Sequence, residues 1–299
     1  MRQEDRGAAS PTLRSLLFVP GNKASMLEKA LTTRPDALVP DLEDSVPDAE
    51  KAAARATVRE LLPRLASAPA LLIPRVNSLE TDWLEDDLAA VVGPHIAGVS
   101  IGKIRGAEDI GTISALMADL ERRAGLAIGK IKLVPWIETA EAVVHCHAIC
   151  KASERIAAVA FGAEDFTHDM GVERLDDETQ LAYARAAICV AARAAGVPAL
   201  DTPYFKFRDE EGLRTSAVAA KRLGFKGKFA IHPAQVAVLT ECFSPSREEI
   251  EAAERIVAAF EEAERRGRGS TSLDGRVIDV PVVKRARAVL RLARSEPQH

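Results

Sequence analysis

Short apolar runs alternate with longer amphipathic segments along most of the chain. The first run, Ser15–Val19, ends at Pro20-Gly21 like a short buried strand, and residues 23–34 then keep the apolar spacing of a helix. Seven further runs repeat this order, each followed by a helical segment. We predict strands over residues 37–39, 71–76, 97–101, 131–137, 156–161, 197–200 and 228–231.

Eight strand–helix units within about 255 residues predict an α/β fold, a (β/α)8 TIM barrel. The same units could instead wind into an open, doubly wound sheet, which is the alternative fold. We favour the barrel. Its eighth helix is expected in the long segment 247–266, where Glu248 and Glu249 in the first turn complement the helix dipole.

The C-terminal part of the chain lies outside this repeat. Residues 267–271, Gly-Arg-Gly-Ser-Thr, predict a flexible break, and a last amphipathic helix follows residues 277–281. One face of that helix carries Val282, Ala286, Val289, Leu290 and Ala293. We therefore expect a flexible N-terminal tail over residues 1–12, a barrel over 13–266, and a C-terminal helical arm or lid over 267–299.

Composition narrows the class of protein. The 299 residues are 47% hydrophobic and 28% charged, as in ordinary globular proteins. Forty Lys and Arg residues against 44 Asp and Glu leave no basic excess, which argues against nucleic acid as the main partner. No apolar run approaches the roughly 20 residues that span a bilayer, and no apolar leader follows the charged start. We expect a cytoplasmic protein without a membrane partner, whose four cysteines are reduced thiols.

Charged and polar side chains follow most of the predicted strands. In a TIM barrel the carboxyl ends of the strands meet at one face, and the active site lies there. The sequence therefore predicts a ring of polar groups at this face: Asp41, Glu43, Asp44, Arg75, Asn77, Lys103, Glu138, Glu164, Asp165, Asp201 and His232.

Two acids of this ring suggest a metal site. Glu138 and Asp165 are one strand–helix unit apart, so they belong at neighbouring strand ends. Adjacent carboxylates repel each other unless a cation or a shared proton lies between them. Mg²⁺ commonly binds through one or two carboxylates and keeps positions for water and substrate oxygens. The alternative is that these acids only cap the helices that follow, and for Asp44 capping or a salt bridge is the better interpretation.

Two cations of the ring have open roles. The planar guanidinium of Arg75 could hold a substrate carboxylate or polarise a carbonyl, or it could pair with the acids of the second strand. Lys103 is a poor candidate for a Schiff base, because the surrounding acids would raise its pKa, so we expect a salt bridge or a substrate contact. The sequence shows no dinucleotide-binding, P-loop or nucleophile-elbow motif.

Several motifs in fixed order carry a family resemblance. They are Arg14-Ser-Leu-Leu-Phe-Val-Pro-Gly21, Asp41-Leu-Glu-Asp44, Arg75-Val-Asn77, Ile137-Glu-Thr139, Phe161-Gly-Ala-Glu-Asp165, Phe207-Arg-Asp209 and Ile231-His-Pro233. With them the chain resembles, from about Leu13 to Arg294, the citrate lyase beta-subunit-like group of the HpcH/HpaI aldolase/citrate lyase family, which includes malyl-CoA and citramalyl-CoA lyases.

The resemblance implies a function and roles for four residues. Family members are Mg²⁺-dependent barrels that make or break the C–C bond between an acyl-CoA enolate and a 2-oxo acid. Glu138 and Asp165 match the metal ligands, and Arg75 matches the arginine that contacts the reacting acyl or carboxylate group. Asp279 matches an acid/base that reaches into the site of a neighbouring subunit, which implies a homo-oligomer, a trimer or a hexamer.

Two local departures concern the expected site. Val39-Pro40 precedes Asp41 where the family usually has an aliphatic or aromatic residue, and Ser100-Ile-Gly-Lys103 replaces the more usual Leu-Pro-Lys. The substrate is therefore less well defined than the metal. The alternatives are a citryl-thioester lyase subunit that works on an acyl carrier protein, a malyl-CoA thioesterase, and, from a different class, a noncatalytic barrel partner.

Overall fold

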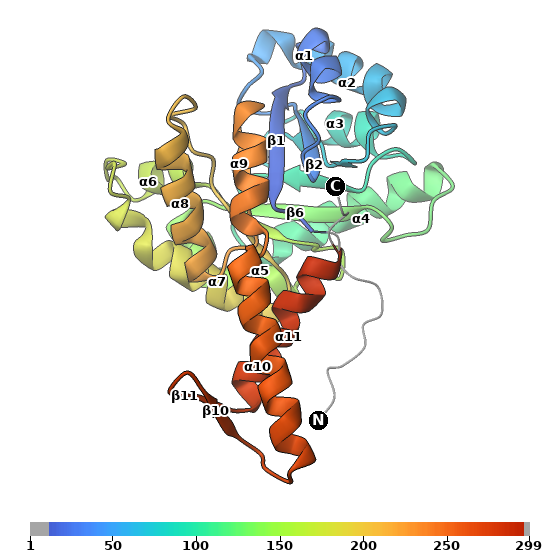
Figure 1. Ribbon diagram of the computed structural model, residues 1–299. Coiled ribbons are helices and arrows are strands. Elements are labelled where there is room, and N and C mark those ends of the chain that lie inside the picture. Colours follow the sequence, from blue (N-terminus) through green and yellow to red (C-terminus); the bar gives the residue numbers. More distant parts are fainter. Residues whose placement is uncertain (1–11, 296–299) are drawn as a thin grey trace. The chain divides into compact units, whose positions relative to one another are not determined.

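The computed structural model describes residues 12–295 and confirms the predicted TIM barrel (Figure 1). The barrel strands are all parallel, and the sheet closes because β1 pairs with both β2 and β9. Pro74, which has no N–H to donate, separates the third strand into two short pieces, β3 and β4. The strands are β1 (Ser15–Pro20), β2 (Ala37–Asp41), β3 (Leu71–Leu72), β4 (Arg75–Val76), β5 (Gly98–Ile101), β6 (Lys132–Ile137), β7 (Val159–Phe161), β8 (Ala199–Asp201) and β9 (Gly227–Ala230).

Helices connect successive strands. They are α1 (Ala24–Ala30), η1 (Asp48–Glu50), α2 (Lys51–Leu65), α3 (Leu84–Val91), α4 (Ala107–Arg123), α5 (Ala140–Lys151), α6 (Ala163–Asp169), η2 (Thr179–Leu181), α7 (Ala182–Ala195), α8 (Glu210–Leu223) and α9 (Ala234–Phe243). The sequence pattern missed two of them, α6 and α9. The helix that directly follows β9 is α9, and not the segment 247–266 that we expected there.

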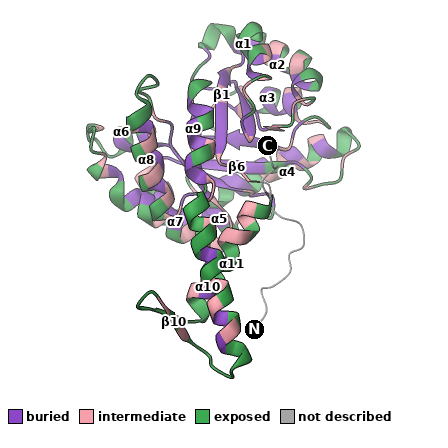
Figure 2. Ribbon diagram, viewed as in Figure 1, coloured by how far each residue is buried: buried purple, intermediate pink, exposed green. Residues whose placement is uncertain are grey.

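Alternate residues of the strands fill the inside of the barrel. Side chains in a strand point to opposite faces in turn, so every second residue points inward. The inward set forms one apolar cluster of Leu13, Leu16, Ala37, Val39, Ile73, Val134, Trp136, Ala158, Ala160, Leu200 and Phe229, with Phe18 and Leu71 packed against it. Figure 2 shows the strands buried and the outer helix faces exposed. Three aromatic rings stack within this core, with centroids 4.5 Å (Trp136–Phe229), 5.0 Å (Phe18–Phe229) and 5.8 Å (Phe18–Trp136) apart.

A buried ion network lies outside the barrel, between the sheet and α7. Asp201 and Lys228 are in register on β8 and β9, and Lys228 Nζ donates to Asp201 Oδ2 at 2.5 Å. Arg185 of α7 donates to both oxygens of Asp201 at 3.0 and 3.2 Å, and to Glu178 at 2.6 Å. Each buried charge thus has a partner of opposite sign, as burial requires.

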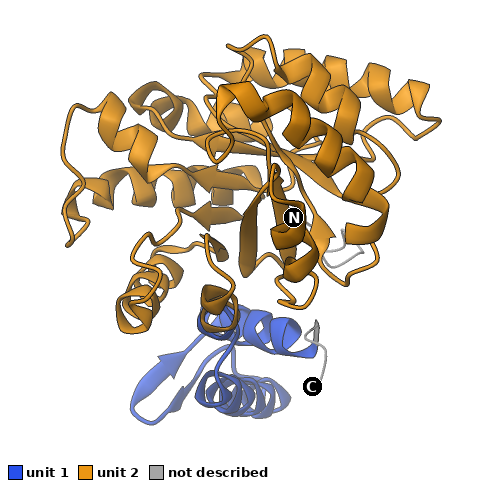
Figure 3. Cartoon of the chain, turned by 90° about the horizontal axis from the view of Figure 1, so that it is seen from above, with its two compact units in different colours: residues 1–11, 241–299 blue, residues 12–240 orange. Residues whose placement is uncertain are grey.

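The chain forms two compact units, residues 12–240 and, in the described part, residues 241–295 (Figure 3). The second contains α10 (Arg247–Arg265), the hairpin β10 (Thr271–Leu273) and β11 (Arg276–Ile278), and α11 (Val280–Ser295). Its core is Phe260, Ile278 and Val283, with neighbouring apolar side chains packed on them.

The division at residue 240 differs from the expected boundary after residue 266. The reason is that α10 packs on α11 and β10, so it groups with the C-terminal segment. The expected flexible tail falls, except for Thr12, outside the described residues. No helix within residues 12–295 has both the length and the apolar character needed to cross a bilayer. The four cysteines are buried thiols.

Candidate active site

Inward and outward side chains alternate along each strand, and this alternation places charged residues at the mouth of the barrel. Asp41, Arg75 and Glu138 each stand two positions after an inward-pointing core residue, respectively Val39, Ile73 and Trp136. Because the side-chain period of a strand is two, these three residues continue the inward face where the apolar core ends. The charged groups are therefore collected at the carboxyl ends of the strands, where barrel enzymes place their chemistry.

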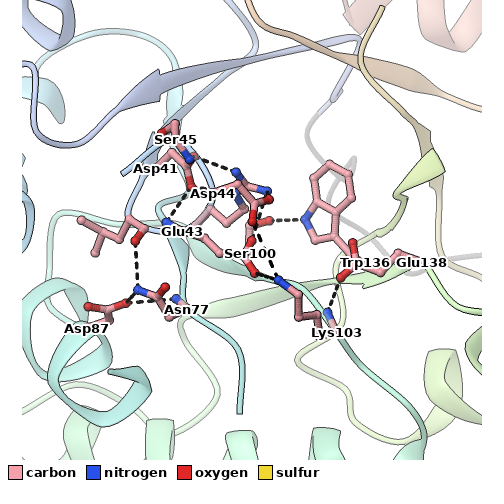
Figure 4. Close-up of polar contacts among 12 residues, drawn as sticks. Asp41, Glu43, Asp44, Ser45, Asn77, Asp87, Ser100, Lys103, Trp136 and Glu138 are labelled. Carbon is pink, nitrogen blue, oxygen red and sulfur yellow. Dashed lines mark hydrogen bonds and ion pairs between the residues drawn. The ribbon is translucent and has the colours of Figure 1, made fainter. Parts of the chain in front are cut away.

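Arg75 forms ion pairs with three acids, Asp41, Glu43 and Asp44, and Figure 4 labels these acids. Its Nε and Nη2 donate to the two oxygens of Asp41 at 2.6 and 2.7 Å, a bidentate pair. Its Nη1 donates to Asp44 at 2.9 Å and lies 3.1 Å from Glu43. The guanidinium carbon lies 4.6 Å from the ring centroid of Phe18, on the aromatic layer of the core.

These contacts identify the partners of two residues whose roles the sequence left open. Arg75 pairs with the acids of the second strand, and Asp44 takes part in a salt bridge, one of the two roles expected for it. Burial opposes the charge of Arg75, but Asp41, Glu43 and Asp44 together raise the pKa of its guanidinium further above its usual value. Three of its five N–H groups donate to these acids, so the guanidinium is held in one orientation with donors still available.

Lys103 joins two acids of the site. Its Nζ donates to Glu43 at 3.0 Å and lies 3.8 Å from Asp44, while its main-chain N–H donates to Glu138. Burial lowers the pKa of Lys103, but the charge of Glu43, helped by Asp44 and Glu138, raises it well above its ordinary value. A lysine whose pKa is raised is a poor Schiff-base nucleophile, and the contact with Glu43 confirms the salt bridge expected for Lys103.

Glu138 is buried between two glycines of the neighbouring strands. A Cβ at Gly102 would lie 2.8 Å from Glu138 Oε1, and one at Gly162 would lie 2.5 Å from Oε2, so side chains at these positions would collide with the carboxylate. Burial, followed by the nearby charges of Glu43 and Asp165, raises the pKa of Glu138 to about 8. A carboxylate with so high a pKa is poorly stabilised by the protein alone.

Asp165 lies in the first turn of α6, one strand further round the barrel. The side chain is half-buried, and burial, then the charge of Asp44, raises its pKa. Several contacts hold α6 in place: Ala163 N donates to Thr202 Oγ1 at 3.3 Å, Asp169 accepts from Ala140 N at 2.7 Å, and Glu164 pairs with Arg174. Asp165 itself is thus anchored close enough for its charge to act on Glu138.

The charge balance of the site suits a divalent cation. Five carboxylates face two cationic side chains: Asp41, Glu43, Asp44, Glu138 and Asp165 against Arg75 and Lys103. Hard oxygen ligands and a local excess of negative charge are what Mg²⁺ prefers. Across residues 12–295 no cluster of three or more His, Cys, Asp or Glu side chains is arranged to enclose a metal. The metal site predicted at Glu138 and Asp165 would therefore be an open one, with two protein carboxylates.

The structure removes Asp201 from the expected ring. Leu200 is the inward residue of β8, so Asp201 points to the opposite face and pairs with Lys228 behind the sheet. The sequence placed it at the rim because a strand end was known but its inward register was not. A shift of one residue reverses the face to which a strand residue points.

His232 follows β9 at the carboxyl face. Its ring stacks on Phe207, with centroids 5.1 Å apart, and both border a cavity of ≈420 Å³ together with Gln235. Gln235 Oε1 accepts the main-chain N–H groups of Ile231 at 2.9 Å and His232 at 3.3 Å, which fixes the turn.

Asp279 belongs to the C-terminal unit. It stands between β11 and α11, where its Oδ1 accepts from Val282 N at 3.2 Å, so it acts as an N-cap of α11. Its side chain is exposed.

Sequence reasoning underrated Glu43 and missed the two glycines. Glu43 is buried and contacts both Arg75 and Lys103, and burial raises its pKa in spite of Arg75. The available signal was its position in Asp41-Leu-Glu-Asp44, but the sequence did not show which of these acids the turn buries. Gly102 and Gly162 could have been suspected, since each ends a strand beside Glu138.

The fold and the charged mouth define a class of protein, a (β/α)8 barrel enzyme with its site at the carboxyl ends of the strands. The family model of HpcH/HpaI aldolase/citrate lyase matches residues 14–233. The chain belongs to this family, as the sequence motifs indicated.

Relatives and solved structures agree with this assignment. The chain is 37% identical over 280 residues to citrate lyase subunit beta of Leuconostoc mesenteroides subsp. cremoris, covering 94% of this chain and 93% of that protein. It is 33% identical over 292 residues to the mitochondrial citramalyl-CoA lyase of Rattus norvegicus, covering 94% and 86%. The crystal structure of CitE from Mycobacterium tuberculosis, in complex with magnesium, acetoacetate and coenzyme A, superposes with a TM-score of 0.78 at 28% identity, covering 96% and 99%. These relatives are lyases, which argues against a noncatalytic role.

Proposed function

We propose that the protein is a Mg²⁺-dependent carbon–carbon lyase that cleaves or forms a 3-hydroxyacyl-CoA, such as malyl-CoA or citramalyl-CoA. The products of cleavage are acetyl-CoA and a 2-oxo acid. The observation that carries the proposal is the paired Glu138 and Asp165 beside a fixed Arg75 at the mouth of the barrel. The magnesium, acetoacetate and coenzyme A named for the CitE structure support the same ligand classes.

Glu138 and Asp165 would hold the metal, with Gly102 and Gly162 leaving room for the Glu138 carboxylate. Bound there, Mg²⁺ would supply Lewis-acid activation and orientation of the 2-oxo acid. Two protein carboxylates leave open positions for substrate oxygens. Asp41 keeps the guanidinium of Arg75 oriented, so that a remaining N–H can donate to the oxygen of the thioester enolate without reorganisation.

Asp279 would exchange the proton of the acetyl methyl group. In this proposal it comes from a neighbouring copy of the chain, so the active enzyme is a homo-oligomer, a trimer or a hexamer. Its exposed side chain and its place at the start of α11 are compatible with this role. A positioned carboxylate of this kind acts as a general acid–base.

A second candidate, a citryl-thioester lyase subunit acting on an acyl carrier protein, is favoured by the 37% identity to citrate lyase subunit beta. Barrel, metal pair and Arg75 would serve both reactions, since both cleave a C–C bond next to a thioester. The two differ in the thioester carrier and in the acyl group, and hence in the 2-oxo acid that cleavage releases. Hydrolysis of malyl-CoA would require the same site to admit water.

One assay separates these functions. The protein is incubated with Mg²⁺, acetyl-CoA and glyoxylate, and malyl-CoA and free malate are resolved by mass spectrometry; citramalyl-CoA and a citryl-acyl carrier protein are offered in parallel. We expect malyl-CoA formation or citramalyl-CoA cleavage, lost with EDTA and in Asp279→Asn. Free malate alone would indicate a thioesterase, and turnover of the carrier-bound substrate alone would indicate the citrate lyase function. No product from any substrate would refute the proposal.

A further inference from the structure

The connection after β5 holds Glu138 through its main chain. Residues 102 and 103, Gly-Lys, follow the strand directly, and the N–H of Lys103 donates to Glu138 Oε1 (Figure 4). The side chain of Lys103 turns to Glu43, at 3.0 Å. One residue thus contacts both buried acids from a strand next to β6 in the sheet.

Lys103 adopts a backbone conformation that side chains rarely take. Its φ is +57°, in the left-handed region, where residues other than Gly, Asn or Asp are disfavoured. Such conformations persist where surrounding contacts hold them, and they concentrate at functional sites. At Lys103 the contacts that hold this conformation are those to Glu138 and Glu43.

Gly102 supplies the space that this arrangement needs. Its missing Cβ would lie 2.8 Å from Glu138 Oε1 and 3.1 Å from Glu43 Oε1, so any side chain would displace one of the two carboxylates. The left-handed residue and the glycine before it thus constrain the same carboxylate, one by a hydrogen bond and the other by leaving room. The same connection contains Gly106, where a Cβ would meet no atom within 4 Å.

We propose that Gly102 and Lys103 are positioning residues that set the orientation of the Glu138 carboxylate for metal binding, Lys103 through its left-handed main-chain N–H and Gly102 through its missing side chain. The proposal rests on the metal site of the proposed function. Outer partners that orient a metal ligand typically change metal affinity about 10- to 100-fold when they are altered.

The charge of Lys103 and its main-chain conformation have opposite expected effects on Mg²⁺ affinity. An experiment can therefore distinguish the two effects. A cation close to a metal site weakens metal binding, so loss of the lysine charge alone would strengthen it. Lys103→Gly and Lys103→Val remove the same charge and the same contact to Glu43. They differ in that glycine accepts φ of +57° without strain, whereas a β-branched residue does not.

The experiment measures Mg²⁺ affinity by titration calorimetry and the Mn²⁺ spectrum by electron paramagnetic resonance, with the full chain and no substrate. We expect Lys103→Val to bind Mg²⁺ about tenfold more weakly than Lys103→Gly, and to show an altered Mn²⁺ signal. Gly102→Ala should weaken binding by at least about tenfold, with Gly106→Ala as the matched control that retains wild-type affinity.

Thermal melting of each variant separates positioning from folding. Equal Mg²⁺ affinity in Lys103→Gly and Lys103→Val, or in Gly102→Ala and Gly106→Ala, would overturn the proposal. If Gly102→Ala does not fold, the Lys103 pair still decides. A wild type that binds neither Mg²⁺ nor Mn²⁺ would instead refute the metal site, and with it the proposed function.

Discussion

Two charged clusters of the barrel differ in how their charges are balanced. Behind β8 and β9, Asp201 and Glu178 face Lys228 and Arg185, acid for base. Burial would raise the pKa of Glu178, but hydrogen bonds and charge from Arg185, with Lys228 and Arg174, lower it to about 2. At the barrel mouth, acids outnumber bases, and the pKa of Glu138 rises to about 8.

The difference indicates that the balanced cluster serves stability and the unbalanced cluster serves function. In the balanced cluster each charge has a partner of opposite sign, so no further ion is needed. Because Asp201, Lys228 and Arg185 lie on β8, β9 and α7, the cluster links the sheet to that helix. The unbalanced cluster retains a negative excess that the protein itself does not neutralise, which is costly unless a cation binds. Carboxylates whose pKa is raised by burial and by neighbouring like charges are typical of functional sites.

The largest effect on stability is expected from the balanced cluster. Lys228→Met leaves Asp201 buried beside Arg185 alone and should lower the free energy of unfolding by about 3–5 kcal/mol, measured by urea denaturation. The exposed Lys226→Met, two residues earlier, is the control and should change little. A Lys228→Met protein as stable as wild type would show that this network is not structural.

Glu138→Gln should lower activity and leave stability unchanged, in contrast to Lys228→Met. We expect turnover to fall by more than about 100-fold, because the proposed metal ligand is lost, with no loss in melting temperature, because a poorly stabilised buried carboxylate becomes neutral. Steady-state kinetics and thermal melting measure the two effects. Glu141→Gln, an exposed acid on the first turn of α5, should leave both unchanged. Loss of stability without loss of turnover would contradict the comparison.

The pH dependence of stability tests Glu178. Its pKa in the folded protein, about 2, lies below its ordinary 4.5, so the stabilisation is complete above pH 4.5 and is lost as pH falls toward 2. With the side chain 16% exposed, we expect about 1–2 kcal/mol from urea titrations between these pH values. In Glu178→Gln this part of the pH dependence should disappear. If the free energy of unfolding of Glu178→Gln depends on pH below 4.5 as in the wild type, Glu178 does not contribute to the stability.

The smallest effect on the free energy of unfolding is expected from an exposed ion pair on α10. Arg247 and Glu251 of α10 are 2.8 Å apart, but their side chains are 88% and 57% exposed. Arg247→Gln should therefore change the free energy of unfolding by no more than about 0.5 kcal/mol. A larger effect in urea denaturation would show that the number of ion pairs, and not their burial, determines stability here.

The two predicted metal ligands show how far local pattern reaches. Glu138 and Asp165 could be proposed because each comes shortly after an apolar run, one strand–helix unit apart, and neighbouring strands of a barrel end at the same face. The role of Arg75 could not be decided in this way, since its partners Asp41 and Asp44 are more than 30 residues away in the chain. The catalytic role of Asp279 stays a prediction.

The sequence by itself determined the order of the eight strands and of most helices, and it favoured the barrel over an open sheet, because period and turn chemistry are local properties of the chain. Only the tertiary structure decided which face each strand-end residue points to: Asp41 and Glu138 inward, Asp201 outward behind the sheet. It also decided that α10 joins α11, and that Gly102 leaves space for Glu138. These features depend on strand register and on contacts between distant residues, and a one-residue shift in register reverses the face without changing the hydrophobic pattern.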